Sequence, residues 1–170
     1  VLFRSDPSTI VETDYTLATT ALKEHVFRVA KVDTSTPSIT LVCMGSLGTS
    51  IMHDSESNVS FTNTFMYKQM LHQIYLNLHE VFETNIKESN VTLLTSSDIF
   101  SPYSYSEGDA SSNNVQLPLF ALNPEYISIN SNYWLKDKES NEFRYVNASG
   151  HLNHADNLQR FAIRPVFTIS

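Results

Sequence analysis

The chain combines short apolar segments that predict strands with one longer periodic segment that predicts a helix. Val26–Val32 and Ile39–Met44 lie on either side of a Pro-containing turn, which predicts a hairpin of two strands. From Asn63–Glu88 apolar residues recur every three or four positions, which predicts an amphipathic helix with Thr62 or Thr64 as its N-cap. The apolar face of this helix comprises Met66, Met70, Ile74, Leu78, Val81 and Phe82.

The segments after this helix predict a small sheet with long connections. Pro118 interrupts the apolar segment Val115–Leu122, which we therefore expect to be an edge strand or a packed loop. Ser96–Asn114 has neither strand nor helix periodicity and is expected to be a long loop. One helix packed on an antiparallel sheet is an α+β fold, and no internal repeat indicates a second domain. The remaining strands are expected at Val91–Leu94, Phe143–Val146, His151–Asn153 and Phe161–Ile169.

Charge and cysteine content exclude several classes of protein. The 170 residues carry a formal charge of −7 with 17% charged residues, so we expect no cationic face that binds nucleic acid or an anionic membrane. No apolar run approaches the ~18 residues of a membrane span, and no membrane insertion is expected. The single cysteine, Cys43, excludes an internal disulfide and a Cys-based zinc site. It lies in an apolar strand, where we expect a buried thiol.

The first five residues read as foreign sequence. Val1–Ser5 (VLFRS) matches the translation of the end of a common sequencing adapter, and the alternative is an ordinary apolar strand start or a tag scar. We expect residues 6–170 to form a single domain, and we expect this domain to be the C-terminal part of a longer protein.

Three motifs near the end of the chain resemble a known family. These are YWLKD at Tyr133–Asp137, RYVNASGHLN at Arg144–Asn153 and FAIRPVFTI at Phe161–Ile169. Together they resemble the YWLR…G…VRP signature of a domain family of unknown function, found at the C-termini of Firmicutes surface proteins and prophage proteins. Lys136 stands where that family usually has Arg.

The resemblance implies a fold and a class of function. The family looks like a variant of the C-type-lectin-like fold, which is shared with formylglycine-generating enzymes. It implies one main helix on a small antiparallel sheet, with long irregular loops that bind ligands. The expected location is extracellular, on a cell surface or on a phage particle. The expected partner is a cell-surface protein or glycan, and the alternative is a purely structural surface domain.

The candidate ligand-binding residues lie in the long loop and beside the C-terminal strands. Tyrosines supply amphipathic contact area at a low entropy cost, and Asn and Ser supply adaptable hydrogen bonds, as in antibody binding loops. We expect the segments Asn130–Asn132 and Asn141–Tyr145 to contribute further contacts to the bound ligand. The residues chosen as ligand-binding are Tyr103, Tyr105, Glu107, Asp109, Asn113, Asn132 and Tyr145.

Two metal sites are possible alternatives. Lectin-like domains often bind sugars through calcium, and Glu107, Asp109, Asn113 and Asn114 carry oxygen ligands of the right kind. Zinc at His151 and His154, with Asp156, would need further ligands that the nearby sequence lacks. We therefore expect no metal and no other cofactor.

Catalysis is not expected either. Formylglycine-generating enzymes need a cysteine pair, and the sequence contains no nucleophile elbow, phosphate loop or paired-carboxylate motif. Trp134 and Arg164 could line a ligand groove. The structural interpretation, which we favour, has Trp134 in the core and the guanidinium of Arg164 hydrogen-bonded to loop carbonyls.

Overall fold

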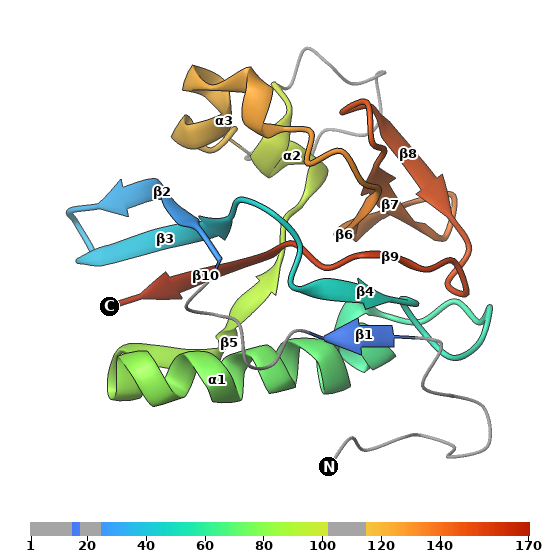
Figure 1. Ribbon diagram of the computed structural model, residues 1–170, viewed down its shortest axis with the longest axis horizontal. Helices are drawn as coiled ribbons and strands as arrows, with labels where there is room; N and C mark the ends of the chain where they lie inside the picture. Colours follow the sequence, from blue (N-terminus) through green and yellow to red (C-terminus); the bar gives the residue numbers. More distant parts are fainter. Residues whose placement is uncertain (1–14, 18–24, 102–114) are drawn as a thin grey trace.

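A computed structural model of the chain describes residues 15–17, 25–101 and 115–170. The Val1–Ser5 segment lies outside the described residues. The fold is α+β, as predicted, with one main helix and two sheets (Figure 1). In spatial order, one sheet contains β1 (Tyr15–Leu17), β4 (Gly48–Ser50), β9 (Phe161–Ala162), β6 (Tyr133–Glu139), β7 (Glu142–Val146) and β8 (Leu152–Ala155). The other contains β2 (Phe27–Asp33), β3 (Ser38–Cys43), β10 (Pro165–Ile169) and β5 (Ile86–Leu93).

The predicted N-terminal hairpin is confirmed. β2 and β3 pair in antiparallel register, with Phe27 opposite Cys43 and Val32 opposite Ile39. The pairing shifts by one residue between Val29 and Lys31, which marks a bulge. Every pair of neighbouring strands in the described ranges is antiparallel except β6 and β9, which meet in parallel at one position.

The main helix is shorter than predicted at its C-terminal end. It begins as a π-helical segment, Met66–Leu71, and continues as α1 (His72–Phe82). Thr64 caps its start, because the Thr64 Oγ1 accepts a hydrogen bond from the Tyr67 N–H at 3.1 Å. The predicted end at Glu88 is wrong: Glu83 takes a left-handed φ of 49°, and after one short turn the chain enters β5. No glycine marks this reversal in the sequence.

Two further predictions are corrected. The segment Val115–Leu122, predicted to be an edge strand or a packed loop, ends in a short helix, α3 (Pro118–Leu122). Pro118 lies in the first turn of this helix, where its missing N–H leaves no hydrogen bond unmade. Phe161–Ile169 is not one strand, because the chain passes from the six-stranded sheet to the four-stranded sheet between β9 and β10.

Smaller shifts affect three other segments. The strand expected at Val91–Leu94 begins earlier, at Ile86, and the one expected at His151–Asn153 is β8, one residue later at its start. The expected long loop opens with a short helix, α2 (Ser96–Ile99), which the side chains of Thr95 and Asp98 cap reciprocally.

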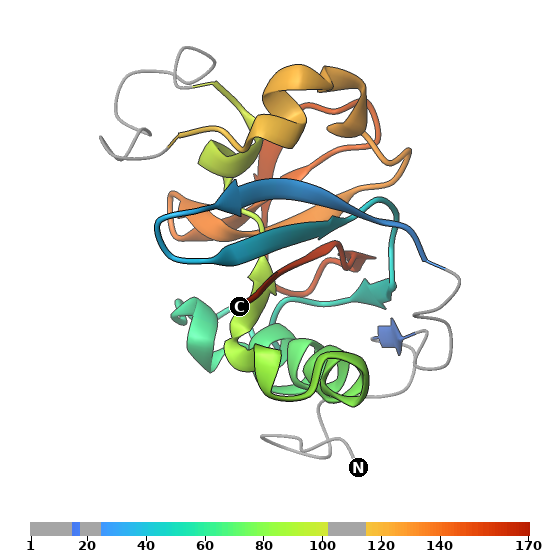
Figure 2. The ribbon, with the colours of Figure 1, turned by 90° about the vertical axis from the view of Figure 1, so that its left-hand side faces the viewer.

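The four-stranded sheet separates two apolar layers. Figure 2 shows α1 on one side of this sheet and α2 and α3 on the other. On the α1 side, Met70, Ile74 and Leu78 pack with Phe167 of β10. On the α3 side, Leu119 and Phe120 pack with Ala30 and Val42. Among the described residues, no helix has the length and apolar character needed to cross a membrane.

Trp134 lies in the core, as the structural interpretation predicts. Its side chain is fully buried, and its Nε1 donates a hydrogen bond to the Ser50 carbonyl oxygen at 2.8 Å. This bond connects β6 to β4, with β9 between them in the sheet. The ring of Phe161 in β9 packs against the indole at a tilt of 49°, with the ring centroids 4.6 Å apart.

Replacing this side chain tests its structural role. We expect Trp134→Ala to lower the free energy of unfolding by about 3–5 kcal/mol, because it removes a large core aromatic and leaves a cavity. Chemical denaturation measures the change. Val26→Ala, at a side chain 61% exposed, is the control and is expected to shift stability by about 0.5 kcal/mol or less. Equal effects of the two changes would contradict the role.

Candidate functional site

Most of the predicted ligand-binding residues belong to a segment that the structure does not describe. Tyr103, Tyr105, Glu107, Asp109 and Asn113 lie outside the described residues, as does Asn114. Their assignment stays a prediction.

The other two predicted residues have structural contacts. The Asn132 Oδ1 accepts a hydrogen bond from the Ala148 N–H at 3.0 Å, and the Asn132 carbonyl accepts one from the Ala162 N–H at 2.8 Å. Tyr145 stacks against Phe161 at a centroid distance of 4.4 Å, next to Trp134. These contacts hold the β6–β7 hairpin against its neighbours.

The two segments expected to assist binding belong to one hairpin, where Asn130–Asn132 precedes its first strand and Asn141–Tyr145 runs from the turn along its second strand. Asn130–Asn132 precedes β6, and Asn141 lies in the tight turn that joins β6 to β7. A strand advances about 3.3 Å per residue, so the seven residues of β6 separate Asn132 from Asn141 by roughly 20 Å. One small ligand therefore cannot contact both Asn132 and Asn141, whereas Tyr145, which pairs with Trp134, lies at the Asn132 end.

Three histidines of the described ranges each lie beside a single carboxylate. His154 Nδ1 lies 3.0 Å from Glu142 Oε2, and His53 Nε2 lies 3.0 Å from Asp54 Oδ1. Within the described ranges, no three His, Cys, Asp or Glu side chains gather as a metal site would require. Burial lowers the pKa of His53 and outweighs the opposing effect of Asp54.

A buried arginine joins the two sheets. Arg164, between β9 and β10, is fully buried and donates hydrogen bonds from Nε to the Cys43 carbonyl at 2.8 Å and from Nη1 to the Ile127 carbonyl at 3.2 Å. Nη1 also lies 3.2 Å from the Tyr133 hydroxyl. The predicted role of Arg164, bonding to main-chain carbonyls, is confirmed.

The same surroundings set the chemistry of two neighbours. Burial raises the pKa of Tyr133 to about 12, and the nearby Arg164 guanidinium only partly opposes this effect. The Tyr133 hydroxyl donates to the Ile127 carbonyl at 2.7 Å. Burial also raises the pKa of the Cys43 thiol, which is fully enclosed, as the sequence predicted.

A second buried arginine fixes the start of the long loop. Arg144 Nη1 donates to the Ser96 Oγ at 2.9 Å and lies 3.2 Å from the Asp137 carboxylate. The Ser96 N–H also donates to Asp137, at 2.9 Å. Arg144 is 2% exposed, so it acts as an anchor below the surface.

A pocket opens on the α1 side of the four-stranded sheet, and we call it the hairpin pocket. Its volume is about 550 Å³, which falls in the range of small-ligand sites. Three separate segments meet there: the β2–β3 hairpin, the end of the main helix and the end of β10. The lining residues are Val32, Asp33, Thr34, Pro37, Ser38, Ile39, Phe82, Asn85, Ile169 and Ser170.

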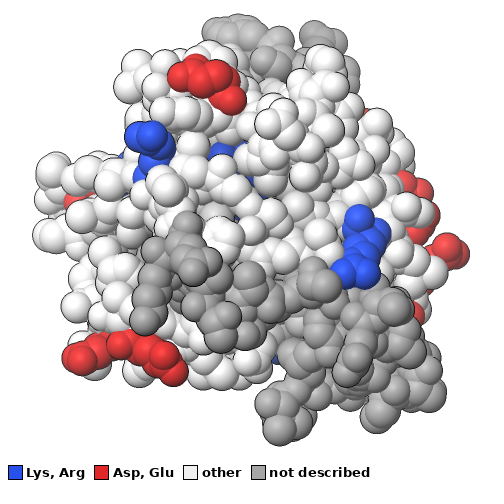
Figure 3. Space-filling view, viewed as in Figure 1, with Lys and Arg blue, Asp and Glu red and all other residues white. Residues whose placement is uncertain are grey.

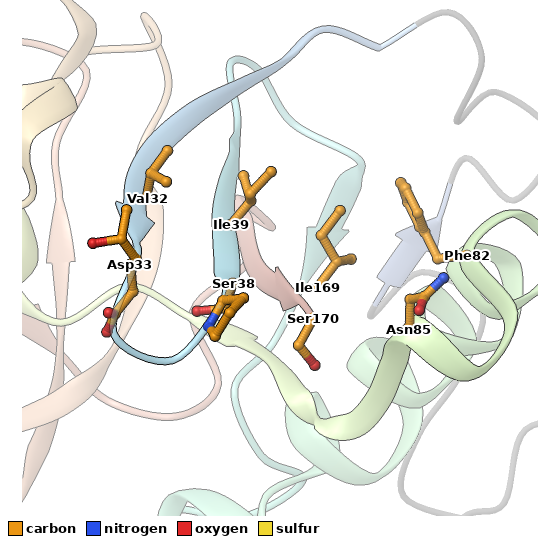
Figure 4. Close-up of a pocket in the computed structure, with 10 residues that line it drawn as sticks. Val32, Asp33, Ser38, Ile39, Phe82, Asn85, Ile169 and Ser170 are labelled. Carbon is orange, nitrogen blue, oxygen red and sulfur yellow. The ribbon is translucent and has the colours of Figure 1, made fainter.

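Strand register explains why the pocket is apolar. Ile39 lies opposite Val32 on one side and Ile169 on the other, so three aliphatic side chains form a row across β2, β3 and β10. Figure 4 shows Val32, Ile39, Ile169 and Phe82 pointing to the same side. Because the helix ends at Phe82, it covers β5 and β10 and leaves Val32 60% and Ile39 36% exposed.

The polar groups of the pocket are few, and Asp33 is the one charged side chain among the described residues that line it. The Asp33 Oδ1 accepts hydrogen bonds from the Ser35 hydroxyl at 2.6 Å and from the N–H groups of Ser35 and Thr36. These bonds, led by that of the Ser35 hydroxyl, lower the pKa of Asp33, so it stays a carboxylate at neutral pH.

The sequence predictions missed this pocket. The available signal was the apolar Val29, Val32 and Ile39 in a hairpin whose outer strand also carries Arg28 and Lys31. The chain matches no protein-family model, and searches of curated proteins and of solved structures give no significant match.

The buried Tyr133 hydroxyl predicts a dependence of stability on alkaline pH. Its pKa is higher in the folded chain than its ordinary value of 10.0, so the folded state keeps a proton that the unfolded state releases. This contribution, about 3 kcal/mol, is present in full below pH 10 and is lost as the pH rises towards 12.

Denaturant unfolding between pH 9 and pH 12 measures this effect. We expect Tyr133→Phe to flatten the fall in stability above pH 10, with lower stability at neutral pH because the hydrogen bonds of the hydroxyl are lost. Tyr75→Phe, on the partly exposed face of α1, is the control and keeps the wild-type slope. An unchanged slope in Tyr133→Phe would contradict the assignment.

Proposed function

We propose that this chain is a non-enzymatic ligand-recognition domain that binds an apolar group of its ligand in the hairpin pocket. The observation that carries the proposal is the row Val32, Ile39, Ile169 and Phe82, which lines a volume of about 550 Å³ with few polar groups. Pockets of this size and composition are typical of small-ligand and side-chain binding sites.

Burial of exposed aliphatic surface supplies the binding free energy. Val32 is 60% exposed, and a bound apolar group that covers it gains about 25 cal/mol per Å² of apolar surface removed from water. The shape of the pocket is set by strand pairing and by the end of the main helix. Binding therefore costs little conformational entropy, because the pocket is already formed in the free chain.

The resemblance to the Firmicutes and prophage domain family supports a proposal for where in the cell or virion this domain binds its ligand. It favours a C-type-lectin-like arrangement and a location outside the cell, on its surface or on a phage particle. The segment predicted to be a long loop is a second candidate contact. Its described neighbours, α2 and α3, lie on the other side of the four-stranded sheet (Figure 2).

Binding of a neutral apolar dye tests the pocket. We expect Nile red to bind the wild-type chain with enhanced fluorescence, and Val32→Asn to weaken this binding about fivefold to tenfold, because it replaces part of the apolar lining. Val26→Asn is the matched control, because Val26 is 61% exposed and does not line the pocket. It is expected to leave the affinity unchanged.

Two other outcomes would change the proposal. If a Tyr103→Ala/Tyr105→Ala variant loses Nile red binding and Val32→Asn keeps the wild-type affinity for the dye, the ligand site lies in the loop and not in the hairpin pocket. Glycan binding that requires calcium and is lost on chelation would favour the lectin alternative. Absence of any binding, with neutral substitutions at both places, would favour a structural domain.

A further inference from the structure

The hairpin pocket has an acidic border. Asp33 lines it on the hairpin side. Glu83 lies between the two lining residues Phe82 and Asn85, and Glu80 lies one turn earlier in α1; both are exposed. In Figure 3 acidic side chains gather at the lower left, over the last turns of α1, and a smaller acidic area lies over the β2–β3 turn.

These carboxylates are not placed to stabilise the helix. The C-terminal end of a helix carries a partial negative charge, which acidic side chains in the last turn oppose. Glu80 and Glu83 both stand at this end of α1, and the basic residue of its last turn is His79. A positive charge bound beside the pocket would be attracted by the helix end and by Asp33 and Glu83. Glu80 adds only a longer-range attraction, because it lies about 200° around the helix from Phe82.

The nearby cations cancel this border only in part. Lys31 stands two residues before Asp33 on the same face of β2, and its ammonium is among the groups that lower the pKa of Asp33, so it offsets part of the charge of that carboxylate. In Figure 3 the basic side chains in this part of the view lie higher, towards α2 and α3. With Lys87, which follows the buried Ile86, two ammonium groups stand against the carboxylates of Asp33, Glu80 and Glu83 and the negative end of the helix.

The apolar surface extends beyond the pocket along the hairpin. Val29 is 50% exposed and lies opposite Leu41, on the same face as Val32 and Ile39. β2 is the outer strand of its sheet in the part of the chain that is described. An apolar strip along an outer strand suits an elongated partner better than a compact one.

We propose that the hairpin pocket takes a peptide segment in which a bulky apolar side chain lies next to Lys or Arg. The inference rests on the proposed function, because the apolar side chain fills the pocket while the neighbouring cation faces Asp33 and Glu83. A second copy of the chain fits less well, because a symmetric contact would bring two acidic borders together in a chain of formal charge −7.

Three capped peptides of sequence Lys-Val-Phe-Val-Lys, Gln-Val-Phe-Val-Gln and Glu-Val-Phe-Val-Glu test the inference by titration calorimetry on the full chain. We expect the Lys peptide to bind about fivefold more tightly than the Gln peptide, and the Glu peptide to bind most weakly. Raised salt should reduce these differences and leave binding of the Gln peptide nearly unchanged.

Charge-neutralising variants locate the effect. Asp33→Asn/Glu83→Gln should remove the preference for Lys and keep the affinity for the Gln peptide, because an amide oxygen at position 33 still accepts the bonds of Ser35 and Thr36. Glu56→Gln/Glu125→Gln removes two exposed carboxylates that do not line the pocket, and it should keep the preference.

The remaining outcomes separate this inference from the proposed function. Equal binding of all three peptides would overturn the charge preference and leave the apolar site in place. Binding of Nile red without binding of any peptide would overturn the peptide partner alone. Failure of both dye and peptides would remove the proposed function as well. A dimer in light scattering that Val32→Asn dissociates would replace the peptide with a second copy.

Discussion

The guanidinium of Arg164, one of two buried arginines in the described part of the chain, holds the two sheets in their relative positions. Its donors reach the carbonyls of Cys43 and Ile127 and the hydroxyl of Tyr133, and the ring of Phe120 lies 5.2 Å from its centre. Among the described residues no carboxylate pairs with it, and Nη2 has no hydrogen-bond partner. Because a buried charge is costly without such bonds, any arrangement that separates these three groups is disfavoured.

The position of Arg164 determines how the end of the chain is used. Before it, Phe161 and Ala162 belong to the six-stranded sheet, and after it Pro165–Ile169 enters the four-stranded sheet. Ile169 then lies between Ile39 and Ile86 in register, where it forms part of the hairpin pocket. The pocket therefore depends on the junction at Arg164, although Arg164 does not line it.

The polar and apolar groups of the chain divide their roles by depth. The two buried arginines donate hydrogen bonds to main-chain carbonyls, hydroxyls and a carboxylate, so their role is to stabilise the fold. The exposed aliphatic side chains on the α1 side of the hairpin, with carboxylates around them, are the groups that a partner can reach. This combination supports recognition through burial of apolar surface with selection by charge.

The sequence by itself determined the elements whose pattern is local. The N-terminal hairpin, most of the main helix and its cap at Thr64, the α+β class and the buried Trp134 were all predictable, because periodic apolar positions report which side of an element is buried. Tertiary structure decided the rest. The last strand is divided because Arg164 must reach carbonyls from distant segments, and the pocket exists because Val32, Phe82 and Ile169 meet where the helix ends at the left-handed Glu83. No local sequence pattern predicts the division of the last strand or the pocket, since both depend on contacts between residues far apart in the chain.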